Sequence, residues 1–145
     1  MPLDDEDVVA VCRIGLFQNL SPKDIMFLVR VSHTVVAKEG TTVIAQNSIG
    51  DFFYIIVEGL LRIKINAGGT FITVAYLTRG QYVGEKAIME GGVRGATCEA
   101  ARETRLVRVP GFTFRRIMSR PENRGAFDRI NATRDKANQR ILKKK

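Results

Sequence analysis

The residues best suited to binding chemistry lie in one glycine-rich segment, residues 80–97, which holds five of the chain's 13 glycines. Its two candidate functional side chains are Glu85 and Arg94, nine positions apart. Residues with little or no side chain let backbone N–H groups approach a ligand closely, and consecutive amides in a short helical turn form a nest for an anion. The planar guanidinium of Arg94 adds a fork of donors that matches phosphate oxygens. The segment is therefore predicted to bind a phosphate group.

Glu85 restricts the kind of phosphate. A carboxylate beside a bound phosphate repels it unless the carboxylate faces a hydrogen-bond donor. The pair therefore favours a ligand with an anionic phosphate next to a hydroxyl group, such as a ribose phosphate, and one arginine without evident divalent-metal ligands suits a phosphate of low charge. Spacing and composition leave a second interpretation open, in which Glu85 and Arg94 form an ion pair that closes a polar loop without a ligand.

The sequence offers few residues for catalysis. It lacks a Gly-x-Ser-x-Gly motif, a phosphate-binding loop ending in Gly-Lys-Ser/Thr, a His-Glu-x-x-His motif and a Cys-x-x-Cys pair. His33 is the single histidine, so the commonest general base is almost absent. Cys12 and Cys98 cannot form a structural zinc site by themselves. We therefore expect a protein that is not an enzyme and that holds no metal.

The N-terminus and the cysteine content indicate a cellular compartment. The first seven residues are acidic rather than basic and then apolar, and no stretch approaches the ~18 apolar residues of a membrane span. Two cysteines without a signal peptide favour a reducing compartment over a disulfide scaffold. These features predict a cytoplasmic protein with no membrane span.

The net charge of +8 is distributed unevenly along the 145 residues. Residues 1–101 carry nine Lys or Arg against 11 Asp or Glu, whereas residues 102–145 carry 14 against four. A basic C-terminal third invites a nucleic-acid interpretation. However, Phe127 is the one aromatic residue after Phe114, so the aromatic interleaving typical of nucleic-acid binding is thin. A nucleic-acid partner is therefore not expected, and the basic run is interpreted as a solvated helix face or a contact for a partner.

The pattern around the glycines predicts the fold. Eleven of the 13 glycines lie between Gly40 and Gly111, and the segments between them are rich in β-branched and aromatic residues. The strands expected there span residues 41–45, 52–57, 60–65, 70–77, 97–101 and 105–109. Short strands with regular turns favour an α+β fold built on an antiparallel β-roll, a jelly-roll-like barrel, over a parallel α/β sheet.

Helices are expected on both sides of this roll. An acidic start predicts a helix over residues 5–14, and Ser21 followed by Pro22 predicts the N-cap and first turn of a second helix that ends near Val31. A third helix is predicted over residues 112–119, and a weakly amphipathic one follows Gly125. We therefore expect one domain over residues 1–145, with helices in 1–33, the β-roll in 34–110 and C-terminal helices in 111–145.

With these elements in place, the motifs resemble those of the cyclic-nucleotide-binding domains. The phosphate-binding cassette of that family reads Phe-Gly-Glu-x-Ala-Leu, then a short loop, then Arg-Ala-Ala-Thr; residues 83–88 and 94–97 match it with the nine-residue gap of the cAMP-dependent protein kinase regulatory subunits. Upstream, residues 16–21 and 50–56 also resemble family signatures. Four departures are Val83 in place of phenylalanine, Lys86 in place of an aliphatic residue, Asn47 in place of glycine, and Val93 where proline is frequent before the arginine.

The resemblance implies a role for each cassette residue. Glu85 would accept a hydrogen bond from the ribose 2′-hydroxyl, Arg94 would bind the exocyclic phosphate oxygens, and amides around Ala87 and Gly95 would complete the phosphate cradle. Asp51 would orient the arginine. The predicted binding residues are Gly84, Glu85, Lys86, Ala87, Ile88, Arg94, Gly95, Ala96, Thr97 and Asp51. Candidates for a lid over the base are Phe127, Ile130, Asn131 and Arg134.

The resemblance also implies a ligand and a mode of action. Relatives selective for cGMP often carry a threonine after the arginine, and Gly95 lacks that hydroxyl, so cAMP is favoured over cGMP as the regulatory ligand. Binding would move the C-terminal helices and regulate a protein effector such as a kinase or another signalling domain. Two alternatives remain: a degenerate domain of the same fold that acts as a protein docking module, and the ligand domain of a nucleotide-responsive transcription regulator.

Overall fold

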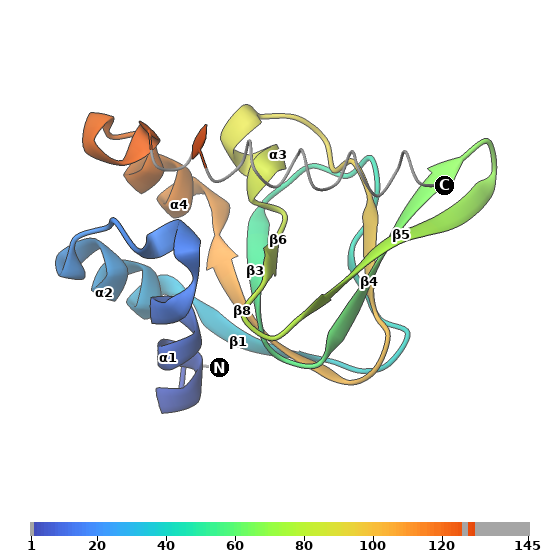
Figure 1. The fold of residues 1–145 in the computed structure, drawn as a ribbon, viewed down its shortest axis with the longest axis horizontal. Helices are drawn as coiled ribbons and strands as arrows, with labels where there is room; N and C mark the ends of the chain where they lie inside the picture. Colours follow the sequence, from blue (N-terminus) through green and yellow to red (C-terminus); the bar gives the residue numbers. More distant parts are fainter. Residues whose placement is uncertain (1, 126–127, 130–145) are drawn as a thin grey trace.

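The barrel is made of two four-stranded antiparallel sheets, with three α-helices on one side and the β4–β5 hairpin extending on the other (Figure 1). This computed structural model describes residues 2–125 and 128–129. The sheet orders are β1-β8-β3-β6 and β2-β7-β4-β5. The elements, in chain order, are α1 (Asp5–Arg13), a 3-10 turn η1 (Gly15–Phe17), α2 (Pro22–Val31), β1 (His33–Ala37), β2 (Thr42–Ile44), β3 (Phe52–Glu58), β4 (Leu60–Ala67), β5 (Thr70–Thr78), β6 (Tyr82–Val83), α3 (Glu85–Glu90), β7 (Thr97–Ala100), β8 (Thr104–Pro110) and α4 (Gly111–Met118).

The first sheet is covered on both faces, which explains its nearly continuous apolar strands. In β3, Phe53, Ile55 and Val57 pack toward the helices, whereas Ile56 packs into the barrel. Side chains of a strand alternate between its two faces, so both sets can be apolar only when both faces are buried. β8 follows the same rule, with Val107 and Val109 toward the helices and Leu106 in the barrel.

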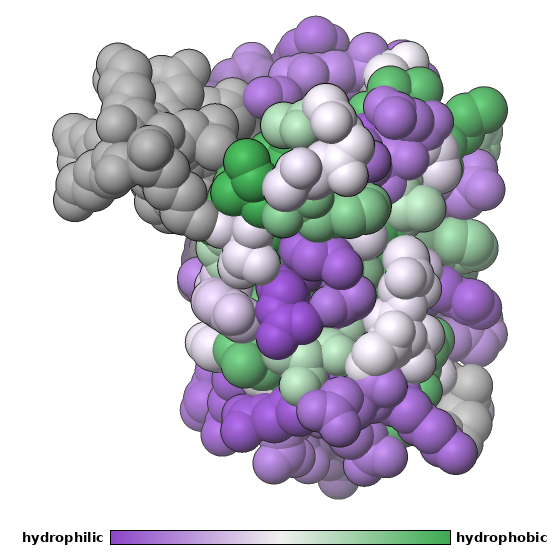
Figure 2. Space-filling view, turned by 90° about the vertical axis from the view of Figure 1, so that its right-hand side faces the viewer, coloured by the Kyte–Doolittle hydropathy of each residue, from purple (hydrophilic) through white to green (hydrophobic). Residues whose placement is uncertain are grey.

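The second sheet carries a polar outer face and an uncharged edge. Arg62 and Lys64 of β4 form ion pairs with Glu99 of β7, at 2.7 and 2.9 Å. β5 is one of the two edge strands of this sheet, and its nine residues include no charged side chain. On the side of the molecule that carries the β4–β5 hairpin, hydrophilic and hydrophobic residues are interspersed rather than gathered into one apolar area (Figure 2).

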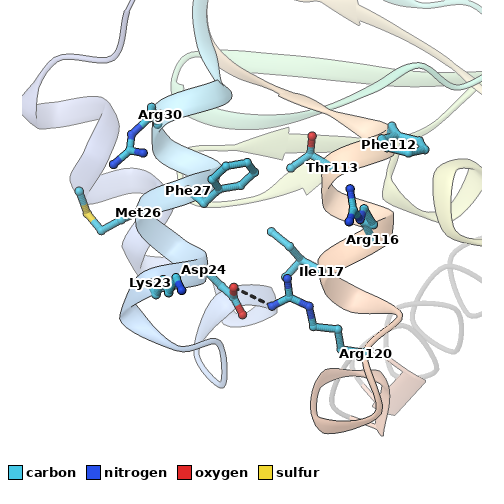
Figure 3. A pocket seen from close by; sticks show the side chains of 10 residues that line it. All are labelled: Lys23, Asp24, Met26, Phe27, Arg30, Phe112, Thr113, Arg116, Ile117 and Arg120. Carbon is cyan, nitrogen blue, oxygen red and sulfur yellow. Dashed lines mark hydrogen bonds and ion pairs between the residues drawn. The ribbon is translucent and has the colours of Figure 1, made fainter.

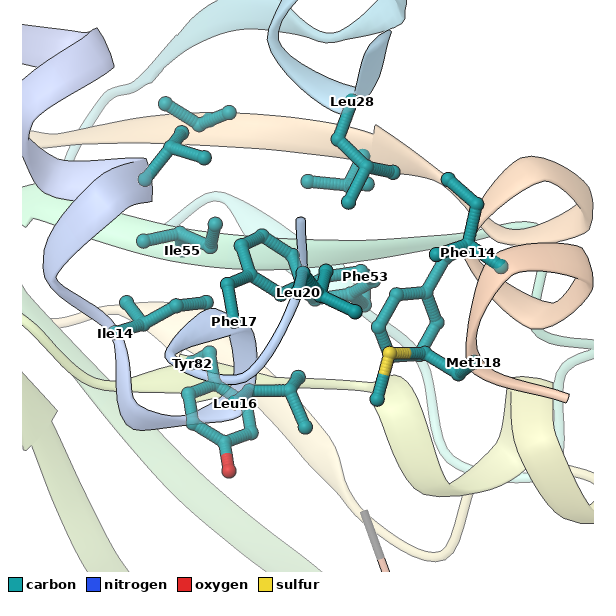
Figure 4. Close-up of a cluster of buried hydrophobic side chains, with 14 of the residues drawn as sticks. Ile14, Leu16, Phe17, Leu20, Leu28, Phe53, Ile55, Tyr82, Phe114 and Met118 are labelled. Carbon is teal, nitrogen blue, oxygen red and sulfur yellow. The ribbon is translucent and has the colours of Figure 1, made fainter. Parts of the chain in front are cut away.

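The helices are fixed to the barrel by a cluster of buried aromatic and aliphatic side chains (Figure 4). Phe17 of η1, Phe53 of β3 and Phe114 of α4 meet at its centre, with ring centroids 4.4–6.1 Å apart. Ile88 of α3 belongs to the same cluster. The cassette helix α3 and the C-terminal helix α4 therefore share one hydrophobic core, so a shift of either changes the packing of the other.

A buried ion pair joins the first helix to the last strand in the described part of the chain. Asp7 of α1 is fully buried and accepts hydrogen bonds from Arg105 of β8 at 2.9 Å and from the Thr34 hydroxyl at 2.5 Å. Burial alone would raise the pKa of Asp7, but the hydrogen bonds from Arg105, Thr34 and the Asp4 amide outweigh it and lower the pKa to about 2. Asp4, the N-cap of α1, also pairs with Arg105.

Most expected elements are confirmed, including the antiparallel β-roll with flanking helices. Ser21 caps α2 through a hydrogen bond from the Asp24 amide, and Pro22 occupies its first turn as predicted. The expected strand set omitted β1 and the two-residue β6. Residues 121–125, just before the helix expected after Gly125, are helical, and residues 126–127 and 130–145 of that expected helix lie outside the described residues. The lid candidates Phe127, Ile130, Asn131 and Arg134 lie outside the described residues, and the domain limits at 1–145 stay a prediction.

Candidate functional site

The site is built where β6 passes into α3 through a left-handed glycine. Gly84 precedes α3 with φ +99°, a conformation that residues with a Cβ rarely adopt. Gly91 ends the helix, also left-handed, and its amide donates to the Ala87 carbonyl at 2.9 Å. The two glycines therefore limit α3 to one and a half turns and place Glu85 at its start. The helix is short because a left-handed glycine terminates it at each end.

The loop after α3 is fixed against the segment before β3. The Arg94 amide donates to the Ser48 carbonyl and the Asn47 amide donates to the Arg94 carbonyl, both at 2.8 Å. Asn47 has φ +69° in this turn, a left-handed conformation that asparagine tolerates better than most residues. This backbone conformation explains why asparagine can stand at the position where the resemblance implies glycine. The loop thereby directs the Arg94 side chain inward.

Arg94 is the central side chain of the site and is 6% exposed. Its guanidinium donates hydrogen bonds to the backbone carbonyls of Gly84 and Phe52. Burial lowers the pKa of Arg94, while Tyr54, Cys98, Glu85 and Asp51 act in the opposite direction. A guanidinium keeps its proton at any physiological pH, so the site contains a buried positive charge that is hydrogen-bonded to neutral carbonyls.

Two glycines make room for this guanidinium. A Cβ on Gly84 would lie 2.7 Å from an Arg94 nitrogen, and a Cβ on Gly50 would lie 3.0 Å from the central guanidinium carbon. Gly50 and the Phe52 carbonyl were missed in the predicted site, although Gly50 stands in the motif of residues 50–56. Gly50 could have been predicted from its place in that motif. The Phe52 carbonyl could not, because every residue type has a backbone carbonyl.

The other predicted residues lie around this centre in different environments. Glu85 is 4% exposed and Ile88 is 5% exposed, so both side chains point into the protein. Ala87 and Ala96 are half-buried, whereas Lys86 and Gly95 are exposed. The Thr97 hydroxyl accepts a hydrogen bond from the Gln46 amide at 3.0 Å, which ties the end of the cassette to the β2 side of the barrel. The structure thus brings Gly84, Glu85, Ala87, Ile88 and Arg94 together.

The orienting role expected of Asp51 stays a prediction. Its side chain is exposed, and within the described residues it forms no ion pair with Arg94, which bonds to backbone carbonyls instead. The main chain of Asp51 has a different contact: its carbonyl accepts a hydrogen bond from the Gly111 amide at 2.8 Å. Asp51 therefore links the entrance of β3 to the start of α4.

The same place on α4 contacts the cassette. A Cβ on Gly111 would lie 2.6 Å from the Asp51 carbonyl and 2.9 Å from the Ile88 side chain. The start of α4 therefore fits closely against both the turn before β3 and the cassette helix. This contact connects the arginine site to the C-terminal helices.

Replacing Gly84 with alanine should damage this site more than the same change at Gly95. At Gly84 the new methyl group meets the Arg94 guanidinium in a left-handed conformation, so we expect a loss of about 1–3 kcal/mol in the free energy of unfolding. At Gly95 a Cβ meets no atom within 4 Å. Chemical denaturation of both variants measures the difference. Equal stability of the two variants would contradict the close packing of Gly84 on Arg94.

Neither a metal-binding cluster nor a membrane-spanning helix is found in the described part of the chain. Residues 2–125 and 128–129 contain no group of three or more His, Cys, Asp or Glu side chains placed to hold a metal ion. No helix in the same residues is both long and apolar enough to cross a membrane. Cys12 is exposed in α1, and Cys98 is buried in β7.

Comparison with known proteins identifies the family of this domain. Residues 34–121 match the family model of the cyclic nucleotide-binding domain. The chain therefore belongs to the cyclic nucleotide-binding domain family. The cAMP-dependent protein kinase regulatory subunit of Schizosaccharomyces pombe is 38% identical over 85 residues, which cover 59% of this chain and 20% of the relative. The chain spans 20–29% of the length of three such regulatory subunits.

Solved structures share the fold at lower sequence identity. The regulatory domain of Toxoplasma gondii cAMP-dependent protein kinase, crystallised with cAMP, gives a TM-score of 0.75 at 22% identity, over 79% of this chain and 46% of the other. The regulatory subunit of a cAMP-independent protein kinase A from Trypanosoma brucei gives a TM-score of 0.79 at 17% identity, over 94% of this chain and 49% of the other. Thermus thermophilus catabolite activator protein gives a TM-score of 0.73 at 22% identity, over 89% of this chain and 62% of the other. The domain thus shares its fold with these three proteins.

Proposed function

We propose that this chain binds a cyclic nucleotide monophosphate, cAMP in preference to cGMP, and relays binding through its C-terminal helices to a protein effector. The observation that carries the proposal is the buried guanidinium of Arg94 beside Glu85 in a glycine-lined turn. A cyclic phosphate diester carries one negative charge, which matches one arginine. The kinship with kinase regulatory subunits supports a kinase or another signalling domain as the effector. The proposal includes no catalytic step.

The proposed ligand contacts follow from the donors and acceptors of these side chains. A guanidinium has five N–H donors, and two of the Arg94 nitrogens already donate to carbonyls, so its remaining N–H groups can donate to the exocyclic phosphate oxygens. Glu85 accepts a hydrogen bond from the ribose 2′-hydroxyl. Amides around Ala87 and Gly95 complete the cradle. Lys86, Ile88, Ala96 and Thr97 form the rest of the proposed cassette.

Calorimetric titration with cAMP, cGMP and 5′-AMP tests this function directly. We expect saturable binding of cAMP, weaker binding of cGMP and the weakest binding of 5′-AMP, which lacks the cyclic diester. Thermal unfolding in saturating cAMP should move to higher temperature, because a ligand that binds the folded state stabilises it. No binding heat and no thermal shift with any of the three would contradict the proposal and would favour a docking module of the same fold.

The proposed preference for cAMP depends on Gly95. Because a Cβ there meets no atom within 4 Å, a threonine side chain can be accommodated. We expect Gly95→Thr to raise the affinity for cGMP relative to cAMP by about fivefold to tenfold, because the added hydroxyl can hydrogen-bond to the guanine amino group. Gly95→Val is the matched control, with the same shape and no hydroxyl. An equal change of selectivity in both variants would show that shape, not the hydroxyl, decides it.

The proposed relay runs from α3 to α4. Ile88 packs in the same cluster as Phe114, and Gly111 fits against both Ile88 and the Asp51 carbonyl. A ligand that draws α3 toward its phosphate therefore changes the surface on which α4 rests. We expect cAMP to change hydrogen exchange of the α4 amides, while the outer end of the β4–β5 hairpin stays unchanged. Identical exchange in α4 with and without bound cAMP would contradict the relay.

A further inference from the structure

A second candidate binding surface lies between α2 and α4 (Figure 3). This α2–α4 groove has a volume of about 450 Å³, and neither Glu85 nor Arg94 lines it. Phe27 projects from α2 toward α4, with Thr113 and Ile117 across from it (Figure 3). The groove is therefore distinct from the proposed nucleotide site.

Exposed apolar side chains gather at the groove. Met26 is 53% exposed, Phe27 is 45% exposed and Phe112 is 78% exposed, although each is large and apolar. Beneath them Ile117 is 3% exposed and joins the buried core. Single exposed apolar residues are common, but several around one recess are typical of surfaces that bind a partner.

The charged residues of the groove are mostly basic. Lys23, Arg30, Arg116 and Arg120 line it, with Asp24 as the one acidic lining residue in the described structure. Asp24 is already paired with Arg120 at 2.8 Å. The groove thus has an excess of three positive charges around an apolar centre. An occupant with complementary chemistry carries carboxylates around a bulky apolar side chain.

The shape of the surface favours a peptide segment over a small ion. A second hollow of about 420 Å³ adjoins the groove and shares Lys23, Asp24 and Arg120 with it. The two hollows therefore lie next to each other at the start of α2, on either side of the residues that they share. The apolar side chains line a recess rather than a flat surface, which fits an inserted side chain better than a lipid surface.

The composition of the chain argues against its own C-terminal segment as the occupant. Residues 126–145 contain seven Lys or Arg and two Asp, so their charge has the same sign as the rim of the groove. The acidic start of α1 in a second copy is also a poor candidate, because Asp4 and Asp7 are engaged by Arg105. The charge of the groove therefore favours a segment of a partner protein as the occupant.

We propose that the α2–α4 groove is a docking site for an acidic amphipathic segment of a partner protein. The segment inserts a bulky apolar side chain against Phe27 and Ile117, and its carboxylates pair with Lys23, Arg30 and Arg116. The groove includes none of the proposed nucleotide-binding residues, so it can be tested on the full chain without any nucleotide. Helix-in-groove recognition of this kind uses apolar anchors on one face of a partner helix.

Fluorescence anisotropy with three labelled peptides tests the proposal. The first peptide, of about 16 residues, carries Leu and Phe on one helical face and Glu on the other; the second has Gln for each Glu, and the third has Ala for each Leu and Phe. We expect the acidic peptide to bind, the Gln peptide to bind about tenfold more weakly and the Ala peptide not to bind. Equal binding of all three, or of none, would overturn the proposal.

Protein variants then locate the binding. Phe112→Ser and Arg116→Glu change exposed residues of the groove, and each should weaken binding of the acidic peptide by about tenfold. Arg115→Glu is the matched control, because Arg115 is exposed on the same helix but does not line the groove, and it should change the affinity by less than about twofold. Equal losses in Arg115→Glu and Arg116→Glu would overturn the proposed location.

Two further measurements separate other occupants. Vesicles of phosphatidylserine and phosphatidylcholine present an anionic lipid surface, and sedimentation velocity over a range of protein concentrations detects self-association. We expect the chain not to bind these vesicles through the groove. We also expect no concentration-dependent dimers that the Phe112→Ser substitution abolishes. Vesicle binding lost in Phe112→Ser would instead assign the groove to a membrane, and dimers lost in that variant would assign it to a second copy.

Discussion

Replacing Arg94 with alanine is expected to weaken cAMP binding by about 100-fold or more. Arg94 is 6% exposed, and the proposed phosphate would pair with its guanidinium in a partly desolvated site. Loss of a charge-assisted pair in such a site costs a few kcal/mol, and about 2.7 kcal/mol corresponds to 100-fold in affinity. Calorimetric titration of the variant with cAMP measures the effect.

Arg94 also has a structural role that the experiment must separate from binding. The alanine variant leaves the Gly84 and Phe52 carbonyls without their hydrogen bonds from Arg94, so the free energy of unfolding should fall as well. Arg94→Lys keeps the charge but not the fork, and should bind cAMP about tenfold more weakly than the native chain. Arg79→Ala removes an exposed arginine between β5 and β6 and serves as the control. A folded Arg94→Ala variant with native affinity would disprove the site.

Replacing Asp7 with alanine should cost about 3 kcal/mol in the free energy of unfolding. The carboxylate is fully buried and accepts hydrogen bonds from Arg105 and Thr34, and removing one partner of such a pair leaves the other without its compensation. Asp5→Asn is the matched control, because Asp5 is exposed in the same helical turn and should change stability by less than about 0.5 kcal/mol. Urea denaturation measures both. Equal effects would contradict the structural role of the Asp7–Arg105 pair.

The pH dependence gives a second signature of the same pair. Folding lowers the pKa of Asp7 from 3.8 to about 2, so its contribution to stability is complete above about pH 4 and is lost as the pH falls toward 2. The stability difference between the native chain and Asp7→Ala should therefore shrink over that window. A constant difference from pH 6 down to pH 2 would show that Asp7 does not titrate with a lowered pKa.

The elements most accurately predicted from the sequence are those with local signals. Ser21 and Pro22 fix the start of α2 within the chain itself, and glycine spacing indicates the hairpins. β1 has no such signal: its burial alternates weakly, and it becomes a strand by pairing with β8, about 70 residues later. Its partner, not its own composition, determines its conformation.

The site shows the same division between local and long-range information. Glu85 and Arg94 could be found because their residue types and spacing suggest chemistry, and the structure buries both. The contact of Arg94 with Phe52 could not be predicted in this way. Phe52 is 42 residues away and contributes a backbone carbonyl, which every residue type possesses. Asp51 was chosen for its carboxylate, yet its described contact with Gly111 is made by its main chain.

The position of β8 has a consequence for how the chain folds during synthesis. β8 lies between β1 and β3 in its sheet, and it is the last strand to be synthesised within the described residues. Until it leaves the ribosome, β1 and β3 lack the strand that joins them, and Asp7 lacks Arg105. Contacts between such distant residues slow folding. The first sheet therefore stays incompletely paired until β8, one of its two central strands, has been synthesised.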